Sequence, residues 1–183
     1  MFTGELVQLT IFETRHHADL MAYLNDPAIS GRRYIPGHVP STLPLTEGEV
    51  SSVIEMFQKR ESRAIFAIEH IVTNQLLGHV TALWGWDTHS PDIAVVIAPE
   101  HQRRGYARET LTIMLDYLFG HLPAHVVETW VESWNVEGAA FAEAMGFRSG
   151  GAARRVGMRN GRFYDEFSFD ILRSEWRAQK AGA

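Results

Sequence analysis

The spacing of apolar residues along the chain changes several times and predicts alternating strands and helices. The opening GELVQLTIF is typical of a strand. We expect a helix next, capped by Thr14 and ended by Asp26-Pro27, and then a loop rich in proline and glycine. Thr46 and Glu49 have the spacing of a capping box, so a second helix is predicted from there to about Glu61.

The remaining sequence predicts strands first, then a long helix, then a closing ribbon. Short polar turns separate AIFAIEHIV, LLGHVTALWGW and DIAVVIA, which favours a meander of antiparallel strands. A helix is expected from close to Gly105 to Gly120, followed by the strand HVVETWVES and a short helix that stops at Gly146. Asn160-Gly161 predicts a final hairpin. The predicted order is β-α-α-β-β-β-α-β-α-β-β.

Composition narrows the class of protein. A chain of 183 residues with 45% apolar and 21% charged residues predicts one domain, spanning residues 1–183, with one core. The absence of cysteine excludes disulfides and a cysteine nucleophile. We expect a cytoplasmic protein that does not bind a membrane, because the sequence shows no long apolar run and no signal peptide. The net charge of −5 argues against nucleic-acid binding, and the scattered histidines argue against a metal.

Candidate chemistry is concentrated in DIAVVIAPEHQRRGYARETLTIMLDYLF, where a strand leads through a proline turn into a helix. The first amides of a helix have no partner within it and attract anions. Gly105 would let a bulky phosphate approach the main chain, and the nearby arginines would add charge-assisted hydrogen bonds. The sequence therefore predicts a diphosphate site, and a solvated basic surface is the alternative. Neither common nucleotide fingerprint, the P-loop or G-x-G-x-x-G, is present.

Two motifs in this region resemble those of one family. Gln102-x-x-Gly105-x-Ala107 resembles the Q/R-x-x-G-x-G/A pyrophosphate motif of the GNAT acetyltransferases, and its surroundings resemble the RimJ/RimL-like branch. Asn135 followed by FAEAMGF resembles a second motif of that branch. The resemblance extends over about 66–172. It implies an α+β fold with α/β/α layers, in which helices cover both faces of a central, mostly antiparallel, splayed sheet.

The resemblance also implies a cofactor, acetyl-CoA, and assigns its contacts. The backbone of residues 96–98 would bind the pantetheine arm, and the Ile97 amide would point toward the thioester oxygen. The start of the following helix, residues 102–108, would bind the diphosphate. Asn135 would contact pantetheine, unless it is only a turn residue, and Phe141 is more typical of a core position. The implied CoA-binding residues are Val96, Ile97, Ala98, Gln102, Arg103, Arg104, Gly105, Tyr106, Ala107, Arg108, Asn135 and Phe141.

Without cysteine, the simplest reaction is direct attack of a primary amine on acetyl-CoA, and a general base would make the amine neutral. Asp92 is the first candidate base, with Glu69 and Asp165 in reserve, although an exposed carboxylate is often only solvated. Ala142 stands where many relatives carry a tyrosine acid. Water or Tyr164 would then protonate the departing thiolate.

The acceptor is expected to be a protein N-terminal α-amine or a small-molecule amine. Its candidate contacts lie in the proline-rich loop and beside the second meander strand, although both tryptophans could equally be packing residues. The alternative function is a non-catalytic CoA-binding sensor or assembly protein, favoured by Ala142 and by Gly138, which replaces a motif serine. Assembly as a homodimer is compatible with either function. The predicted acceptor contacts are Arg32, Arg33, Tyr34, Trp84 and Trp86.

Overall fold

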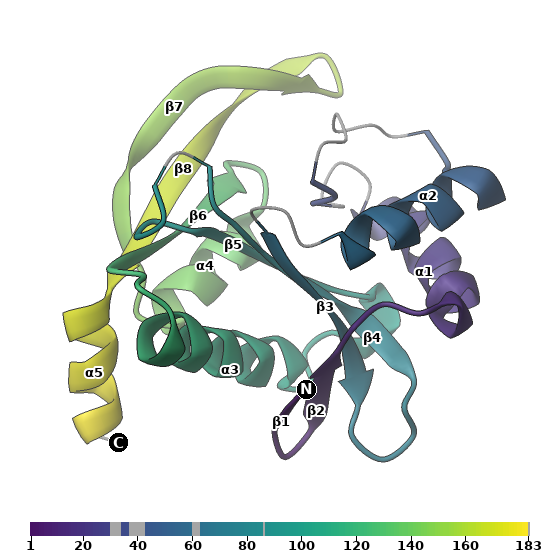
Figure 1. Cartoon of the computed structure of the whole chain (residues 1–183). Coiled ribbons are helices and arrows are strands. Elements are labelled where there is room, and N and C mark those ends of the chain that lie inside the picture. Colours follow the sequence, from purple (N-terminus) through teal and green to yellow (C-terminus); the bar gives the residue numbers. More distant parts are fainter. Residues whose placement is uncertain (30–33, 37–42, 60–62, 86, 183) are drawn as a thin grey trace. The chain divides into compact units, whose positions relative to one another are not determined.

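The chain folds into two compact units. The structure, a computed structural model, describes residues 1–29, 34–36, 43–59, 63–85 and 87–182. The first unit comprises Met1–Leu83 and Ala94–Met114, and the second comprises Trp84–Ile93 and Leu115–Ala183. Strand β5 (Asp92–Ile97) and helix α3 (Tyr106–His121) each contribute residues to both units (Figure 1).

In the first unit, antiparallel strands follow one another in chain order. Strand β2 pairs with β1 and β3, and β3 pairs with β4, all antiparallel. This confirms the first part of the predicted meander. The elements are β1 (Phe2–Thr3), β2 (Val7–Thr10), α1 (His17–Leu24), α2 (Glu47–Gln58), β3 (Arg63–His70) and β4 (Leu76–Leu83), with single 3-10 turns at Thr14–His16, Pro27–Ile29 and Pro99–His101.

Helices α1 and α2 contact each other and bury their apolar stripes in the core of this unit (Figure 1). The predicted capping box of α2 is confirmed, because the Glu49 amide donates to Thr46 Oγ1 (3.3 Å) and the Thr46 amide donates to Glu49 Oε2 (2.7 Å). The helix ends at Gln58, a few residues earlier than predicted. Buried positions recur at helical spacing and are Leu20, Tyr23, Leu24, Val50, Val53, Ile54 and Phe57.

The start of the first helix differs from the prediction. Residues Thr14–His16 form a 3-10 turn, and α1 begins only at His17. Glu13 is the N-cap of this turn, and its amide donates to Nδ1 of the buried His16 ring three residues on (3.0 Å), which is the reciprocal bond of a capping box. Glutamate and histidine are not the usual residues of a capping box, which is why the sequence pattern favoured the threonine.

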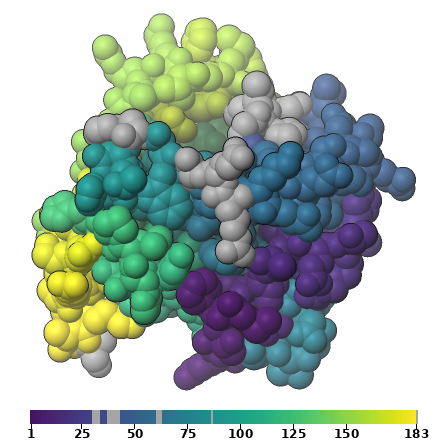
Figure 2. Space-filling view, in the orientation of Figure 1, coloured from purple at the N-terminus to yellow at the C-terminus, as the bar shows by residue number. Residues whose placement is uncertain are grey.

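The second unit contains a long antiparallel ribbon. Strand β8 pairs with both β6 and β7. The predicted hairpin turn is confirmed by the positive φ angles of Asn160 (51°) and Gly161 (73°), and Figure 2 shows residues of this ribbon, in light green, at the surface. The elements are β6 (Val126–Glu132), α4 (Val136–Ala144), β7 (Arg148–Arg159), β8 (Arg162–Leu172) and α5 (Arg173–Gly182).

Helix α5 was not predicted. Trp176 is its one buried residue, and its indole N–H donates to Asp116 Oδ1 (2.9 Å). A single large apolar anchor among polar residues does not form a repeated apolar stripe, so this helix was overlooked.

Strand β5 completes a mixed eight-stranded sheet. Hydrogen-bonded neighbours follow the order β1-β2-β3-β4-β5-β6-β8-β7. Strand β5 pairs with β6 in parallel, with Asp92 opposite Glu128. Helix α3 begins directly after Gly105, as predicted, and continues through Gly120 to His121. This connection places the predicted diphosphate site at the junction of β5 and α3.

Candidate active site

The junction between β5 and α3 is a turn with two left-handed residues. After the 3-10 turn, Gln102 is extended, Arg103 has a φ of 61° and Gly105 has a φ of 89°. The first helical hydrogen bond runs from the Glu109 amide to the Gly105 carbonyl oxygen (3.1 Å). The amides of 106–108 therefore precede the hydrogen-bonded part of the helix, at its positive end.

This turn has the chemistry of an anion site. The side chains of Arg103, Arg104 and Arg108 are exposed around it. Glycine is favoured at position 105 because its φ disfavours any L side chain, and an added Cβ would also lie 3.3 Å from Leu6 Cδ1, which would have to shift slightly. Amides at a helix start, together with arginines, can bind two linked phosphates.

At the end of β5, the backbone groups of Ile97 point to the opposite edge of the strand from those of Val96 and Ala98. The Ala98 amide donates to the Leu77 carbonyl (2.8 Å), and a Cβ on Gly78 would lie 1.9 Å from the Val96 carbonyl oxygen. Val96 and Ala98 therefore direct their backbone groups toward β4. Because successive residues alternate along a strand, the Ile97 backbone points to the opposite edge. Its carbonyl accepts Gln102 Nε2 (2.9 Å), so the Gln102 side chain braces the strand end.

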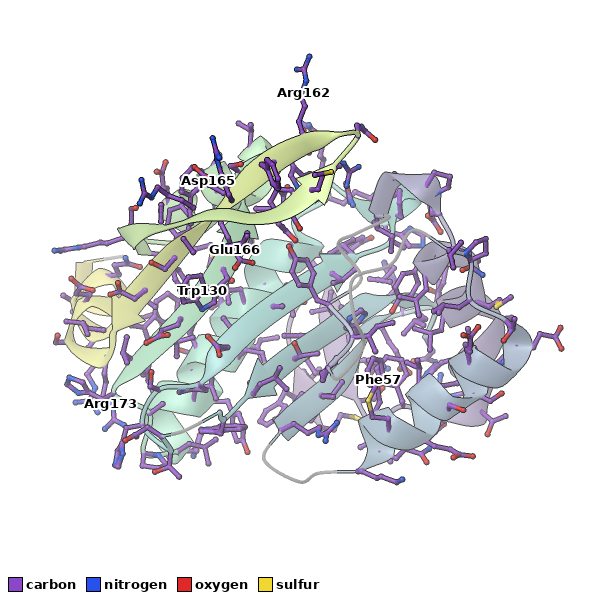
Figure 3. All side chains as sticks on the ribbon, turned by 90° about the horizontal axis from the view of Figure 1, so that it is seen from above. Phe57, Trp130, Arg162, Asp165, Glu166 and Arg173 are labelled. Atoms are coloured by element: carbon purple, nitrogen blue, oxygen red, sulfur yellow. The ribbon has the colours of Figure 1, made fainter. Side chains whose placement is uncertain are left out.

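Five carboxylates share one face of the second unit. Asp92 lies opposite Glu128, Glu128 lies opposite Asp170, and Glu132 lies opposite Glu166. Residues that oppose each other on neighbouring strands project to the same face. Trp130, between the two β6 glutamates, has the same parity and is labelled with Glu166 in Figure 3. We call these five carboxylates with Trp130 the acidic face.

Asp92 is the strongest candidate base on the acidic face. Burial, and then the neighbouring Glu128 carboxylate, raise the pKa of Asp92, while a hydrogen bond from the Trp130 side chain only partly opposes this shift. Asp92 Oδ1 is buried and has no hydrogen-bond partner among the residues that the structure describes. A carboxylate oxygen without a donor, on a group with a raised pKa, accepts a proton more readily than an ordinary aspartate does.

The other carboxylates of this face repel one another as well. Burial and then Glu132 raise the pKa of Glu166. Burial, followed by Glu175 and Glu128, raises the pKa of Asp170, and Arg148 opposes the shift. The face therefore holds negative charge at a cost, which a cationic ligand would relieve.

Glu69 is enclosed by donors instead. Its side chain is 1% exposed, and its two oxygens accept hydrogen bonds from four side chains of the first unit. Burial alone would raise the pKa of Glu69, but the hydrogen bonds and the Arg15 charge outweigh burial, so the pKa is lowered. The geometry therefore favours a structural role for this carboxylate. The donors are Gln8, Thr10, Arg15 and His16.

We predict that Glu69→Gln lowers the free energy of unfolding by about 3 kcal/mol at pH 7, because buried donors lose their charged partner. A lowered pKa stabilises the fold above the unfolded-state pKa, and this contribution disappears as pH falls through the folded-state pKa. Urea unfolding should thus show a smaller difference at pH 3. Glu13→Gln, at an exposed carboxylate that pairs with Arg15, is the control and should change stability by less than about 1 kcal/mol. Equal effects of the two variants would contradict the prediction.

Asp165, the other reserve base, is held by hydrogen bonds to two neighbouring segments. Its Oδ1 accepts the Arg155 amide (2.8 Å), where Arg155 has a φ of 51° in the irregular part of β7. Its own amide donates to Ser133 Oγ (3.1 Å), and the Ser133 amide donates to its carbonyl (2.7 Å). Figure 3 shows Asp165 on the ribbon, next to Glu166 in sequence. Adjacent residues of a strand face opposite sides, so Asp165 is not part of the acidic face.

Asn135 is the N-cap of α4. Its Oδ1 accepts the Gly138 amide (3.2 Å). A Cβ on Gly138 would lie 2.5 Å from Asn135 Nδ2, so the serine of the family motif would disturb this cap. Phe141 is half-buried, and Ala142 is buried without a hydroxyl to offer. Tyr164 packs edge-on against Trp134, with ring centroids 6.3 Å apart.

The predicted acceptor contacts are only partly described. Arg32, Arg33 and Trp86 lie outside the described residues. Tyr34 packs against the core of the first unit with a φ of 47°. In the second unit, Trp84 Nε1 donates to the Thr88 carbonyl (3.2 Å).

Sequence reasoning missed most of the acidic face. Glu128, Glu132, Glu166 and Asp170 alternate with other residues along two predicted strands, which was a visible signal. Their convergence depends on strand pairing between β5, β6 and β8, which no local pattern specifies. Glu109 was missed because its contacts are with a turn about a hundred residues away in sequence.

Comparison with known proteins decides the family. A family model for the acetyltransferase (GNAT) domain matches residues 7–148. The chain belongs to the GNAT acetyltransferases. This confirms the resemblance at the family level and the expectation of an acyltransferase. In the part of the chain that the structure describes, each helix is too short or too polar to cross a membrane.

Curated relatives and solved structures agree with this family. The chain is 23% identical over 165 residues to the uncharacterized N-acetyltransferase YnaD of Bacillus subtilis, covering 90% of this chain and 92% of that protein. It is 33% identical over 87 residues to the spermidine N(1)-acetyltransferase of Vibrio cholerae, covering 48% of this chain and 50% of that protein.

The solved structures confirm the predicted GNAT fold. A GNAT-family acetyltransferase from Bacillus anthracis has a TM-score of 0.81 and 22% identity, with 95% of this chain and 99% of that chain covered. The Vibrio cholerae spermidine N-acetyltransferase in complex with CoA and spermine has a TM-score of 0.80 and 23% identity, with the same coverage.

Proposed function

We propose that this GNAT protein transfers the acetyl group of acetyl-CoA directly to a primary amine that carries positive charge, with Asp92 as the general base. The observation that carries the proposal is the Asp92 carboxylate, which has a raised pKa and a buried oxygen without a described donor. The best-supported acceptor is a small cationic amine, and a protein N-terminal α-amine is the alternative.

The coenzyme site is assigned to the junction of β5 and α3. The amides of 106–108 would bind the diphosphate, together with the exposed arginines at 103, 104 and 108. The Ile97 amide, which points away from β4, would hydrogen-bond the thioester oxygen and polarise it. Gln102 then acts indirectly by holding the Ile97 carbonyl. Asn135 caps α4, and its contact with the pantetheine arm stays a prediction.

The chemistry needs a neutral amine. An alkylammonium group has a pKa of about 10.4, so nearly all of it is protonated at pH 7 and a base must take the proton. Asp92 accepts this proton, directly or through one water, and the neutral amine nitrogen then bonds to the carbonyl carbon. As the carbon–sulfur bond breaks, the nitrogen loses its second proton to water, which leaves the amide and the CoA thiolate. The leaving thiol has a pKa of about 8.5, so water can protonate it where Ala142 offers no hydroxyl.

The acidic face supports a cationic acceptor. After burial, neighbouring carboxylates raise the pKa values of Asp92, Glu166 and Asp170, and a second ammonium group on the acceptor would lower that repulsion. The Vibrio cholerae relative, named for spermidine, agrees with this substrate class. Placement in the RimJ/RimL-like branch, a cytoplasmic location, a single domain and a homodimer stay predictions.

Release of free thiol from acetyl-CoA, measured over a panel of amines, tests the proposal. Spermidine and diaminobutane should react faster than butylamine, which has one ammonium group, and faster than N-terminal peptides. Faster reaction of the peptides would favour the α-amine alternative. Binding of CoA without release by any amine would instead favour a CoA-binding sensor and contradict the proposed function.

A further inference from the structure

The partly exposed carboxylate of Glu109 is held by the turn that joins β1 and β2, about a hundred residues earlier in the sequence. It accepts backbone hydrogen bonds from Glu5 (2.7 Å), Leu6 (2.8 Å) and Val7 (2.7 Å). A Cβ on Gly4 would lie 2.5 Å from Glu109 Cδ, so this turn closes tightly around the carboxylate. Three successive amides that point at one anion form a nest. We call this arrangement the Glu109 clamp.

The position of the clamp is unexpected for a protein that binds a diphosphate. Glu109 is the fourth residue of α3, and helical side chains lean toward the N-terminus of their helix. A carboxylate at this position could turn toward the amides that would bind phosphate, where it would compete with the ligand. The three donors of the nest bind the carboxylate and hold it away from those amides.

The clamp also fixes a side chain beside the phosphate turn. Leu6 is 40% exposed, and its Cδ1 lies 3.3 Å from the position of a Cβ on Gly105. Two further backbone bonds hold the same turn, from the Ile71 amide to the Leu6 carbonyl (3.0 Å) and from the Gly4 amide to the Val7 carbonyl (2.9 Å). The Leu6 backbone is thereby held at both its amide and its carbonyl, and its side chain forms an apolar lip against Gly105.

We propose that Glu109 is a positioning residue for coenzyme binding. It anchors the turn between β1 and β2, and through Leu6 it sets the conformation of Gly105 and of the first amides of α3. The inference rests on the proposed function, in which these amides bind the diphosphate. Glu109 itself does not touch the coenzyme.

The direction in which the Kd of CoA changes distinguishes a positioning role of Glu109 from a simple effect of its charge. Removing a negative charge near a polyanion should tighten its binding, and Glu100→Gln makes that change at an exposed position just before the same turn. Glu109→Gln removes the same charge but places an amide NH₂ among three N–H donors. We expect the Kd of CoA, measured by calorimetry, to rise at least about tenfold in Glu109→Gln. In Glu100→Gln it should stay the same or fall.

Kinetics distinguish positioning from general damage to the fold. In Glu109→Gln the KM for acetyl-CoA should rise by a factor similar to the Kd, while kcat and the KM for the amine change less than about twofold. Parallel losses in kcat and in both KM values would overturn the proposal, as would tighter or unchanged CoA binding in Glu109→Gln. If the wild-type protein does not bind CoA, the proposed function fails first and this inference fails with it.

A second variant leaves the clamp intact. Leu6→Ala removes the lip without changing any backbone donor, and it keeps the test decisive if Glu109→Gln fails to fold. We expect the Kd of CoA to rise at least about threefold, because Gly105 loses its neighbour. Unchanged binding in folded Leu6→Ala would overturn the proposed action through Leu6. Ile11→Ala, at another exposed apolar residue of the first unit, is the matched control and should leave the Kd unchanged.

Discussion

Replacing Arg104 with Glu and Gly105 with Val should raise the Kd of acetyl-CoA at least tenfold, equivalent to about 1.4 kcal/mol or more. Two independent causes contribute. The charge reversal replaces an attractive group at the helix start with a repulsive one. Valine at a φ of 89° is strained, and its Cβ would press on Leu6, so the amides that follow would shift.

Calorimetric titration of the folded double variant with acetyl-CoA measures the effect. Arg154→Glu, a charge reversal at an exposed residue of β7, is the control for net charge and should leave the Kd unchanged. Raised salt should weaken wild-type binding more than it weakens binding to the double variant, because the variant has lost an ionic contact. Wild-type affinity in the double variant would remove the β5–α3 junction as the coenzyme site.

Local patterns predicted the elements whose causes are local. The Thr46 capping box, the Asn160-Gly161 turn and the helix after Gly105 each depend on residues within a few positions of one another. The junction of β5 and α3 belongs to this class, and so the candidate coenzyme site could be found from the sequence. The branch of the family could not be settled by the same motifs, because the departures at Gly138 and Ala142 lie within them.

Features that depend on distant contacts were beyond such patterns. Glu13 and His16 form the capping box at the first helical turn in place of the expected Thr14 cap, and the same histidine ring bonds Glu69 at the far end of β3. From the sequence, Glu69 and Asp92 are both acids on predicted strands, with Asp92 as the first candidate base. The structure shows that donors from β2 and from the Thr14–His16 turn surround Glu69, whereas a second acid, Glu128, lies opposite Asp92. The pKa shifts of the two carboxylates have opposite signs for this reason.

Asp92→Asn should therefore lower kcat/KM at neutral pH by about 100-fold or more, the usual contribution of a positioned base. The defect should shrink as pH approaches the pKa of the amine, because neutral amine then forms without help. In the wild type, activity should fall at acid pH as Asp92 is protonated, and the raised pKa of Asp92 places this fall above the range of an ordinary aspartate. Glu128→Gln should move the fall to lower pH, since one cause of the shift is removed.

The same substitution should make the protein more stable, which distinguishes a strained functional carboxylate from a structural one. A raised folded-state pKa means that the folded state favours the protonated carboxyl. Its contribution to stability is complete below the unfolded-state pKa and is lost as pH rises through the folded-state pKa. At pH 7 the ionised Asp92 thus destabilises the fold, and neutral asparagine should raise the free energy of unfolding, with little change at pH 3.

Urea unfolding at both pH values, together with pH–rate profiles, measures this pair of effects. The control is Asp87→Asn, five residues earlier, where hydrogen bonds from the His89 backbone and side chain lower the pKa of the carboxyl. That variant should keep wild-type activity and gain no stability, because its carboxylate is satisfied. A pH-independent loss of activity in Asp92→Asn, or a loss of stability at pH 7, would show that this carboxylate is a structural partner and that another group takes the proton.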